Sequence, residues 1–356
     1  MAGLTKTQKD PHTALIDGCG RRIDHLRLSV TSKCDLRCVY CEPESATSAD
    51  GNGQRTNGNH KLRLAGAKHD APKPFTLTDE QRVEFVAFLH ERYGLSQVRI
   101  TGGEPLIYRG TVSLVASIRR RMPGIRIAMT TNGRLLYQNG IELKRAGLDR
   151  LNVSLDSLDP ARYHAITRGH IDAVLDGLRS AIFVGFDPPK INTVVLKGMN
   201  DGELVGLARW AMARGHEIRF LEAMPIGPVA ELNRRAFVPA SQIRALLAEE
   251  FTLEPLEAVP GETAKRYAAS NGSCRGVVGI IAPVSEPFCA GCRRIRLTAE
   301  GRLFPCLLDN RSVDLASAWH DGVLRTDAAT ELITSAIAGK KPVGKVQSVP
   351  MISLGG

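Results

Sequence analysis

Short apolar runs alternate with amphipathic stretches through the first two thirds of the chain. Runs rich in β-branched residues and leucine predict six strands, at His25–Thr31, Gln97–Thr101, Arg126–Thr131, Leu151–Leu155, Lys190–Leu196 and Glu217–Glu222. The intervening segments repeat apolar residues at helical spacing and predict helices at Thr78–Tyr93, Thr111–Met122, Leu135–Ala146, Ala173–Val184 and Gly202–Arg214. Thr78 and Gln81 have the spacing of a capping box at the start of the first of these helices.

Strands that alternate with helices of this length indicate βαβ crossovers and a parallel sheet. Six units are too few for a closed eight-stranded barrel. The pattern therefore predicts an α/β fold, either a partial (β/α)6 TIM-type barrel or an open doubly wound sheet. In both architectures the chemistry is expected at the carboxyl ends of the strands.

Two parts of the chain depart from this alternation. Residues 44–74 are rich in Gly, Asn, Ser, Thr, Ala and Lys without periodicity, which predicts a mobile insertion. Beyond about Ala223 the pattern predicts a helix at Gln242–Phe251, a strand at Gly276–Ile281 and a hairpin from Arg294–Thr298 and Leu303–Cys306. We therefore expect a flexible N-terminal segment (1–16), a barrel (17–225) and a smaller C-terminal region (226–356).

The composition is that of an ordinary globular chain of 356 residues with a formal net charge of +10. No apolar run approaches the roughly 20 residues that span a bilayer, and the polar N-terminus lacks a secretory signal. A cytoplasmic protein is expected, and in that reducing compartment eight cysteines indicate metal or redox chemistry rather than disulfides. The positive charge fits nucleic acid, an acidic membrane or a polyanionic small molecule, or simply a solvated surface.

Three cysteines follow the first predicted strand with the spacing Cys-x3-Cys-x2-Cys: Cys34, Cys38 and Cys41. Three thiolates can hold three irons of a four-iron cluster and leave the fourth iron open to a ligand that is not protein. The alternatives are three buried cysteines that pack as small apolar residues, or a zinc site completed by a distant histidine. The x3 spacing counts against zinc, which usually takes Cys-x2-Cys pairs.

A second set of three cysteines lies in the C-terminal region, with the spacing Cys-x2-Cys-x13-Cys: Cys289, Cys292 and Cys306. The same reasoning suggests a second iron–sulfur cluster with an open iron. A zinc site completed by histidine, or one reactive pair and an unrelated thiol, are the alternatives. Cys19 and Cys274 belong to neither set, although Cys274 is close enough in sequence to be an alternative fourth ligand.

Arginines follow the second set directly. In an extended segment Arg294 and Arg296 project to the same face, because strand side chains alternate. Two guanidinium groups beside a cluster form an anion receptor with bidentate geometry for phosphate. The simpler alternative is an exposed strand face.

The segment CDLRCVYC resembles the signature of the radical S-adenosylmethionine superfamily, with Tyr40 as its aromatic residue. The resemblance implies a partial (β/α)6 barrel whose open iron binds the amino and carboxyl groups of S-adenosylmethionine. It also implies reductive cleavage of that cosubstrate to a 5′-deoxyadenosyl radical. Gly103 in TGGEP, Ser154 in NVSLD and Met224 match positions that contact the cosubstrate in the superfamily.

Longer motifs resemble one family within it, the GTP 3′,8-cyclase family of molybdenum cofactor biosynthesis. The matching text is LRLSVTSKCDLRCVYC, RITGGEPL, MTTNG, LNVSLDSL, EIRFLE, FCAGCRRIRLTAEGRLFPC and the terminal Gly-Gly. The resemblance implies two [4Fe-4S] clusters, the second of which binds GTP at the purine. The radical then removes hydrogen from C3′ of the ribose, and the C3′ radical attacks C8 of guanine to give 3′,8-cyclo-7,8-dihydro-GTP.

Motif by motif, this resemblance assigns roles to residues of the present chain. It implies contacts to GTP by Arg27, Arg99, Thr130, Lys190, Arg219, Arg294 and Arg296. Arg294 and Arg296 are also expected at the reacting centre, together with Gly355 and Gly356, which would insert toward the active site and position an arginine. The chain departs from the family in Glu42-Pro43, where Met-Pro is usual, and in the long 44–74 segment.

The family resemblance further implies a low-potential electron donor, a homodimer, and a next enzyme, cyclic pyranopterin monophosphate synthase, that takes the product. Neither nucleic acid nor a membrane is expected as a partner. Two other functions remain open: a peptide-modifying radical enzyme with auxiliary clusters, and a basic nucleic-acid-binding protein with structural zinc. The second would need aromatic residues for base stacking, and these are 5% of the chain. The lack of a Gly-x4-Gly-Lys-Ser/Thr loop argues against an ordinary GTPase.

Overall fold

A computed structural model describes residues 13–41, 75–344 and 351 of the chain. The predicted insertion at 44–74 and the terminal Gly355 and Gly356 lie outside the described residues. So do residues 1–12 of the predicted N-terminal segment.

The fold is built on one 12-stranded sheet with the order β12-β11-β10-β1-β2-β3-β4-β5-β6-β9-β8-β7. Its centre consists of six consecutive parallel strands: β1 (His25–Ser29), β2 (Gln97–Thr101), β3 (Arg126–Thr131), β4 (Arg150–Ser154), β5 (Lys190–Val195) and β6 (Ile218–Glu222). These six lie within one or two residues of the predicted strands. Because their order follows the chain without reversal, the sheet is that of a partial barrel and the doubly wound alternative is wrong.

The C-terminal part of the chain adds strands to both edges of this sheet. At one edge are β10 (Arg294–Leu297), β11 (Arg302–Phe304) and β12 (Val313–Asp314), and at the other β9 (Cys274–Ile281), β8 (Lys265–Asn271) and β7 (Thr252–Pro255). β10 runs parallel to β1 and β9 runs parallel to β6, so eight neighbouring strands share one direction. The described strands do not close the sheet into a complete barrel. The proposed boundary near residue 225 stays a prediction.

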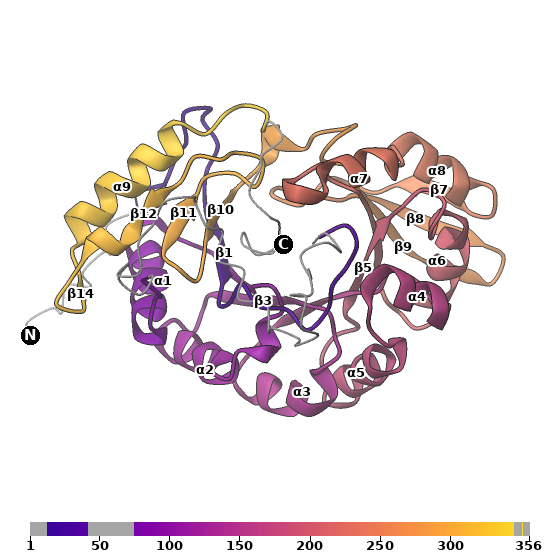
Figure 1. The fold of residues 1–356 in the computed structure, drawn as a ribbon, viewed down its shortest axis with the longest axis horizontal. Coiled ribbons are helices and arrows are strands. Elements are labelled where there is room, and N and C mark those ends of the chain that lie inside the picture. The colour runs from indigo at the N-terminus through magenta and orange to yellow at the C-terminus, as the bar shows by residue number, and fades with distance from the viewer. Residues whose placement is uncertain (1–12, 42–74, 345–350, 352–356) are drawn as a thin grey trace, which may run out of the picture.

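Helices surround the outer side of the curved sheet (Figure 1). The helices of the described ranges are α1 (Asp79–Tyr93), α2 (Thr111–Arg121), α3 (Leu136–Arg145), α4 (Pro160–Thr167), α5 (Ile171–Phe183), α6 (Leu204–Met212), α7 (Ala230–Arg235), α8 (Ala240–Ala248) and α9 (Thr326–Ala338), of which α7 does not belong to the outer layer. A separate hairpin pairs β13 (Trp319–His320) with β14 (Val323–Leu324). The sequence pattern had not predicted α4, α7, α9 or the strands β7 and β8.

The start and end of α1 show why the local sequence folds as it does. The Thr78 hydroxyl accepts a hydrogen bond from the Gln81 backbone N–H, and the Gln81 side chain accepts one from the Thr78 N–H, which confirms the predicted capping box. Gly94 ends the helix with a left-handed φ of 69°, a conformation that costs glycine little.

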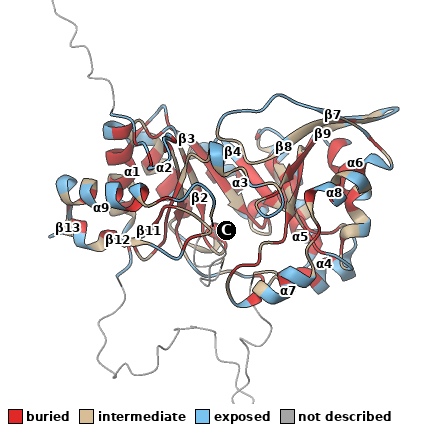
Figure 2. Ribbon diagram, turned by 90° about the horizontal axis from the view of Figure 1, so that it is seen from above, coloured by how far each residue is buried: buried red, intermediate tan, exposed pale blue. Residues whose placement is uncertain are grey.

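Alternation along each strand separates the core from the functional face. In β1, Leu26 and Leu28 are almost completely buried and belong to the core with Phe85 and Leu89 of α1. Burying side chains of this size stabilises the fold by about 1.5–3 kcal/mol each. Arg27 lies between the two leucines and projects to the opposite, concave side. The buried residues concentrate on the strands and on the helix faces that meet them (Figure 2). No helix of the described ranges is long and apolar enough to cross a bilayer.

Candidate active site

A cavity of about 610 Å³ lies along the concave side of the parallel sheet. All six cysteines of the two predicted sets line it, and we call these sets the first triad (Cys34, Cys38 and Cys41) and the second triad (Cys289, Cys292 and Cys306). The first triad follows the carboxyl end of β1. The second lies at the opposite ends of the strands, because two of its cysteines precede β10, which is parallel to β1, and the third follows the antiparallel β11. The expectation that all chemistry lies at the carboxyl ends is therefore too narrow.

Both triads fit iron–sulfur clusters. All six cysteines are partly accessible, line the cavity and form no disulfide in the described structure. Within the described ranges, no three His, Cys, Asp or Glu side chains converge as ligands of one metal ion would. A four-iron cluster instead takes each thiolate on a different iron, which spreads the sulfur atoms apart.

The residues expected to contact S-adenosylmethionine meet beside the first triad. The Tyr40 hydroxyl donates to Asp156 at 2.7 Å. The Asn233 amide donates to the backbone carbonyls of Tyr40 at 3.0 Å and Met224 at 2.8 Å, and so joins two of the predicted positions. Ser154 lines the same part of the cavity.

Gly103 is required by the close approach of two backbones. A Cβ at this position would lie 2.2 Å from the carbonyl oxygen of Lys33. The Gly103 N–H donates to the Thr31 carbonyl at 2.7 Å, which binds the TGGEP turn to the loop that carries the first triad. Any larger residue would force the two apart.

Carboxylates surround the first triad. Burial raises the pKa of Cys34 to about 12, with Glu104 and Asp35 adding to the shift. Burial also raises the pKa of Cys38 well above its usual range, and Asp156 raises it further. Positive charge beside these thiols would therefore be needed to stabilise them as thiolates.

Cations surround the second triad. Burial by itself would raise the pKa of Cys292, but Arg294 and Lys340 lower it to about 6. The Lys340 Nζ atom lies 3.5 Å from the Cys292 sulfur, and an Arg294 Nη atom lies 3.8 Å from it. Cys306 keeps a raised pKa, mainly because of burial. The cations beside the second triad therefore favour the thiolate form of Cys292.

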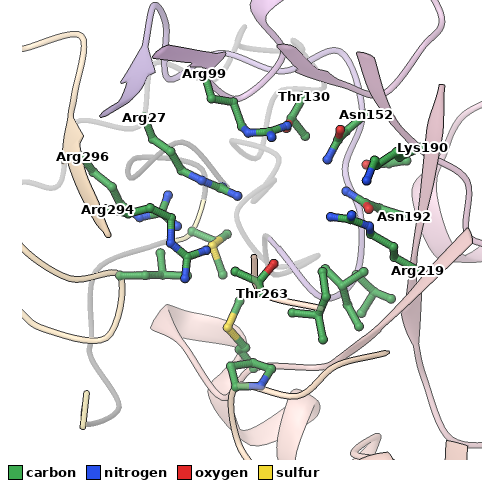
Figure 3. A pocket seen from close by; sticks show the side chains of 18 of the residues that line it. Arg27, Arg99, Thr130, Asn152, Lys190, Asn192, Arg219, Thr263, Arg294 and Arg296 are labelled. Atoms are coloured by element: carbon green, nitrogen blue, oxygen red, sulfur yellow. The ribbon is translucent and has the colours of Figure 1, made fainter. Parts of the chain in front are cut away.

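Four of the predicted nucleotide contacts form a basic wall on β10, β1 and β2: Arg27, Arg99, Arg294 and Arg296 (Figure 3). The strand register places Arg27 between Arg296 and Arg99. Burial lowers the pKa of Arg99 and of Arg296 to about 10, with repulsion from Arg219 and Arg294 adding to the shift of Arg99 and repulsion from Arg294 to that of Arg296. The buried Nε of Arg27 has no hydrogen-bond partner within the described structure. A buried guanidinium nitrogen without a partner, as in Arg27, favours a bound anion.

The opposite wall, on β5 and β6, carries cations that are paired with carboxylates. Lys190 lies 2.8 Å from Glu217 and 3.6 Å from Glu262. Arg219 contacts the same two glutamates at 2.5 Å each. Thr130 lies between the two walls and accepts a hydrogen bond from Arg99 at 3.4 Å. The structure thus brings all seven predicted nucleotide contacts into one cavity, and their individual roles stay predictions.

The sequence pattern missed several residues of this site. Asn152 and Asn192 line the cavity at positions that face it from β4 and β5, and a polar residue inside an apolar strand was the available signal. Glu262 precedes β8, and Lys340 follows α9. Only long-range packing brings these two residues to the site, so no local sequence motif could have identified them.

Two family models match the chain, and together they cover most of it. The Radical SAM superfamily matches residues 28–211, and Molybdenum Cofactor Synthesis C matches residues 216–346. GTP 3′,8-cyclase 1 of Pseudomonas aeruginosa is 39% identical over 352 residues, covering 97% of this chain and 99% of the relative. GTP 3′,8-cyclase of Paenarthrobacter nicotinovorans is 38% identical over 326 residues, covering 88% and 86%.

Solved structures share the fold. Streptococcus suis SuiB bound to the precursor peptide SuiA superposes with a TM-score of 0.57 at 15% identity, covering 90% of this chain and 67% of that one. SuiB bound to S-adenosylmethionine gives 0.55 at 14% identity, covering 92% and 75%. These likenesses establish the fold alone, whereas the family models and curated relatives establish the family. The chain belongs to the radical S-adenosylmethionine superfamily and, within it, to the GTP 3′,8-cyclase family.

Proposed function

We propose that the chain converts GTP to (8S)-3′,8-cyclo-7,8-dihydroguanosine 5′-triphosphate, the first step of molybdopterin cofactor biosynthesis, with S-adenosylmethionine as cosubstrate. One observation supports this most strongly: a single cavity has a cysteine triad among carboxylates at one end and a cysteine triad among cations at the other. A cationic cosubstrate and a polyanionic substrate can therefore occupy the two ends together.

At the carboxylate end, Cys34, Cys38 and Cys41 would hold the first [4Fe-4S] cluster. When bound, this group supplies the electron that cleaves S-adenosylmethionine into methionine and a 5′-deoxyadenosyl radical. Gly103 allows the cosubstrate close to the backbone. Asn233 holds the carbonyls of Tyr40 and Met224 at a fixed separation, and so shapes the wall of the cosubstrate site.

At the cationic end, Cys289, Cys292 and Cys306 would hold the second cluster against the purine. The arginines of the basic wall would bind the triphosphate and fix the ribose between the two ends, with Lys190, Arg219 and Thr130 completing the site. Hydrogen transfer from C3′ to the 5′-deoxyadenosyl carbon leaves a C3′ radical, which bonds to C8 of guanine. One electron and one proton from a low-potential donor then complete the product.

The family resemblance suggests the remaining partners. We propose a homodimer that receives electrons from a low-potential donor and passes its product to cyclic pyranopterin monophosphate synthase in the cytoplasm. Gly355 and Gly356 would position an arginine at the reacting centre. A peptide substrate is the second candidate, but four arginines that line one wall of the cavity favour a polyphosphate.

The activity can be tested with anaerobically reconstituted protein, S-adenosylmethionine, dithionite and GTP. We expect 5′-deoxyadenosine to form together with the cyclised nucleotide, and ATP to replace GTP poorly. Formation of 5′-deoxyadenosine at the same rate with and without GTP, and no consumption of GTP, would contradict the proposal.

A further inference from the structure

Lys340 is a buried cation that belongs to none of the motifs of the family. It follows α9, and only 3% of its surface is exposed. Its Nζ donates to the Arg294 carbonyl at 2.6 Å and contacts the Cys292 sulfur at 3.5 Å. No carboxylate pairs with it within the described structure. A buried ammonium needs a compensating negative charge, and the group in reach is the Cys292 sulfur.

Lys340 stands behind the second triad rather than in the substrate cavity. Arg294 and Cys292 both line the cavity, whereas the Lys340 side chain is not part of its lining. Its ammonium therefore contacts the Cys292 sulfur from outside the cavity lining. This position distinguishes it from the arginines of the basic wall, whose side chains face the ligand.

A turn near the N-terminus, at residues 17–21, makes hydrogen bonds to the segment that carries Lys340. The Asp17 carboxylate, which is fully buried, fixes Arg21 at 2.7 Å. Arg21 then donates to the Lys341 carbonyl at 3.0 Å and to the Cys289 carbonyl at 2.8 Å. One guanidinium group thus ties the backbone of the second triad to the backbone next to Lys340.

Close packing adds to the hydrogen bonds of Arg21 in holding these two segments together. A Cβ at Gly18 would lie 2.5 Å from the Ala338 carbonyl oxygen, so only glycine allows the turn to approach the end of α9. The Cys19 thiol also donates to the Lys340 carbonyl at 3.5 Å. The ammonium is therefore held in place by its backbone as well as by its own hydrogen bond.

We infer that Lys340 is a positioning residue of the second triad. Its positive charge beside the Cys292 sulfur raises the reduction potential of the cluster that this triad would hold. Charge and hydrogen bonds at the ligand sulfur are established means by which proteins tune such clusters. The inference rests on the iron–sulfur chemistry of the proposed function and assigns this lysine to it.

The test is a redox titration, followed by electron paramagnetic resonance, of the full chain carrying Cys34→Ala, Cys38→Ala and Cys41→Ala. In this protein only the second cluster gives a signal. Lys340→Met and Lys340→Gln are expected to shift the midpoint potential to more negative values, while Lys340→Arg keeps it. Lys341→Met is the matched control, since the neighbouring lysine is exposed and should leave the potential unchanged.

Iron content separates the possible outcomes. Loss of iron in Lys340→Met and Lys340→Gln but not in Lys340→Arg would also support the inference, because charge would then be needed to hold the cluster. An unchanged potential at full iron content, wild-type behaviour of Lys340→Gln, or equal iron loss in all three variants would overturn it. If the parent protein formed no second cluster at all, the proposed function would fail instead.

Discussion

The two triads have the same number of thiols and opposite surroundings. Beside the first lie Glu104 and Asp156, and burial raises the pKa of each carboxyl, to about 7 and about 6 respectively. Beside the second lie Arg294 and Lys340, which bring the pKa of Cys292 down to about 6. The cysteine spacing is thus only part of each site. The neighbouring charges distinguish what each end can bind.

This polarity matches the charges of two different ligands. S-adenosylmethionine carries a sulfonium and an ammonium group, which carboxylates stabilise, whereas a triphosphate requires cations. The two ends lie at opposite ends of the same strands, so ligands bound to both would meet in the middle of the sheet. Each of the following predictions alters one end or one wall and compares it with its counterpart.

Loss of a cysteine ligand is expected to have the largest effect, and a different one at each end. Cys38→Ser should abolish S-adenosylmethionine cleavage under all conditions. Cys306→Ser should lower formation of the cyclised nucleotide by at least about 100-fold, more than loss of an outer-shell partner usually costs, while uncoupled cleavage continues. Chromatography of 5′-deoxyadenosine and nucleotides measures both. Equal loss of cleavage in the two variants would contradict the division of labour.

Removal of a cation from the basic wall should come next in size. Arg27→Ala should weaken GTP binding by about 10- to 100-fold, because a hydrogen bond to a charged group contributes about 1.5–3 kcal/mol. Equilibrium binding measured by calorimetry gives the dissociation constant. Arg179→Ala is the matched control, since Arg179 is exposed on α5 and pairs with Asp176. A change of less than twofold in the dissociation constant of Arg27→Ala would contradict a contact between Arg27 and GTP.

The paired wall predicts a change in the opposite direction. Glu262→Gln should strengthen GTP binding, because it releases Arg219 and Lys190 from a carboxylate. We expect about 1 kcal/mol, or about fivefold in Kd, which is the usual net contribution of one intramolecular hydrogen bond. Glu286→Gln, which neutralises a glutamate outside the cavity lining, should leave Kd unchanged. Weaker binding in Glu262→Gln would mean that this glutamate holds the cations in position for the nucleotide.

The smallest effect is a difference in thiol reactivity in the cluster-free protein. The Cys292 thiolate forms as pH rises through about 6, whereas Cys34, with a pKa of about 12, stays protonated at neutral pH. Alkylation of Cys292 should therefore rise between about pH 5 and about pH 7 and then level off, because the thiolate is the reactive form. Peptide mass spectrometry measures the sites separately. Equal rates for Cys292 and Cys34 at neutral pH would contradict the contrast between the two ends.

The sequence predicted the parts of this arrangement that are local. Alternating apolar residues gave all six central strands, and the two cysteine spacings gave both triads. The pattern could not place β10 beside β1 or β9 beside β6, because β9 and β10 lie outside the six predicted strand–helix units. For the same reason Glu262 and Lys340 were not found. The sequence already placed Arg294 beside Cys292, whereas Lys340 at the second triad and Glu104 and Asp156 at the first are long-range neighbours that only the structure shows.

The central claim is that the two ends of the cavity present S-adenosylmethionine and GTP to each other across the sheet. Its most direct test uses GTP carrying deuterium at C3′, incubated with the reduced, reconstituted protein and unlabelled S-adenosylmethionine. We predict that deuterium appears in the methyl group of 5′-deoxyadenosine and that the cyclised nucleotide has lost it. Unlabelled 5′-deoxyadenosine, with deuterium retained in all recovered nucleotide, would contradict the claim.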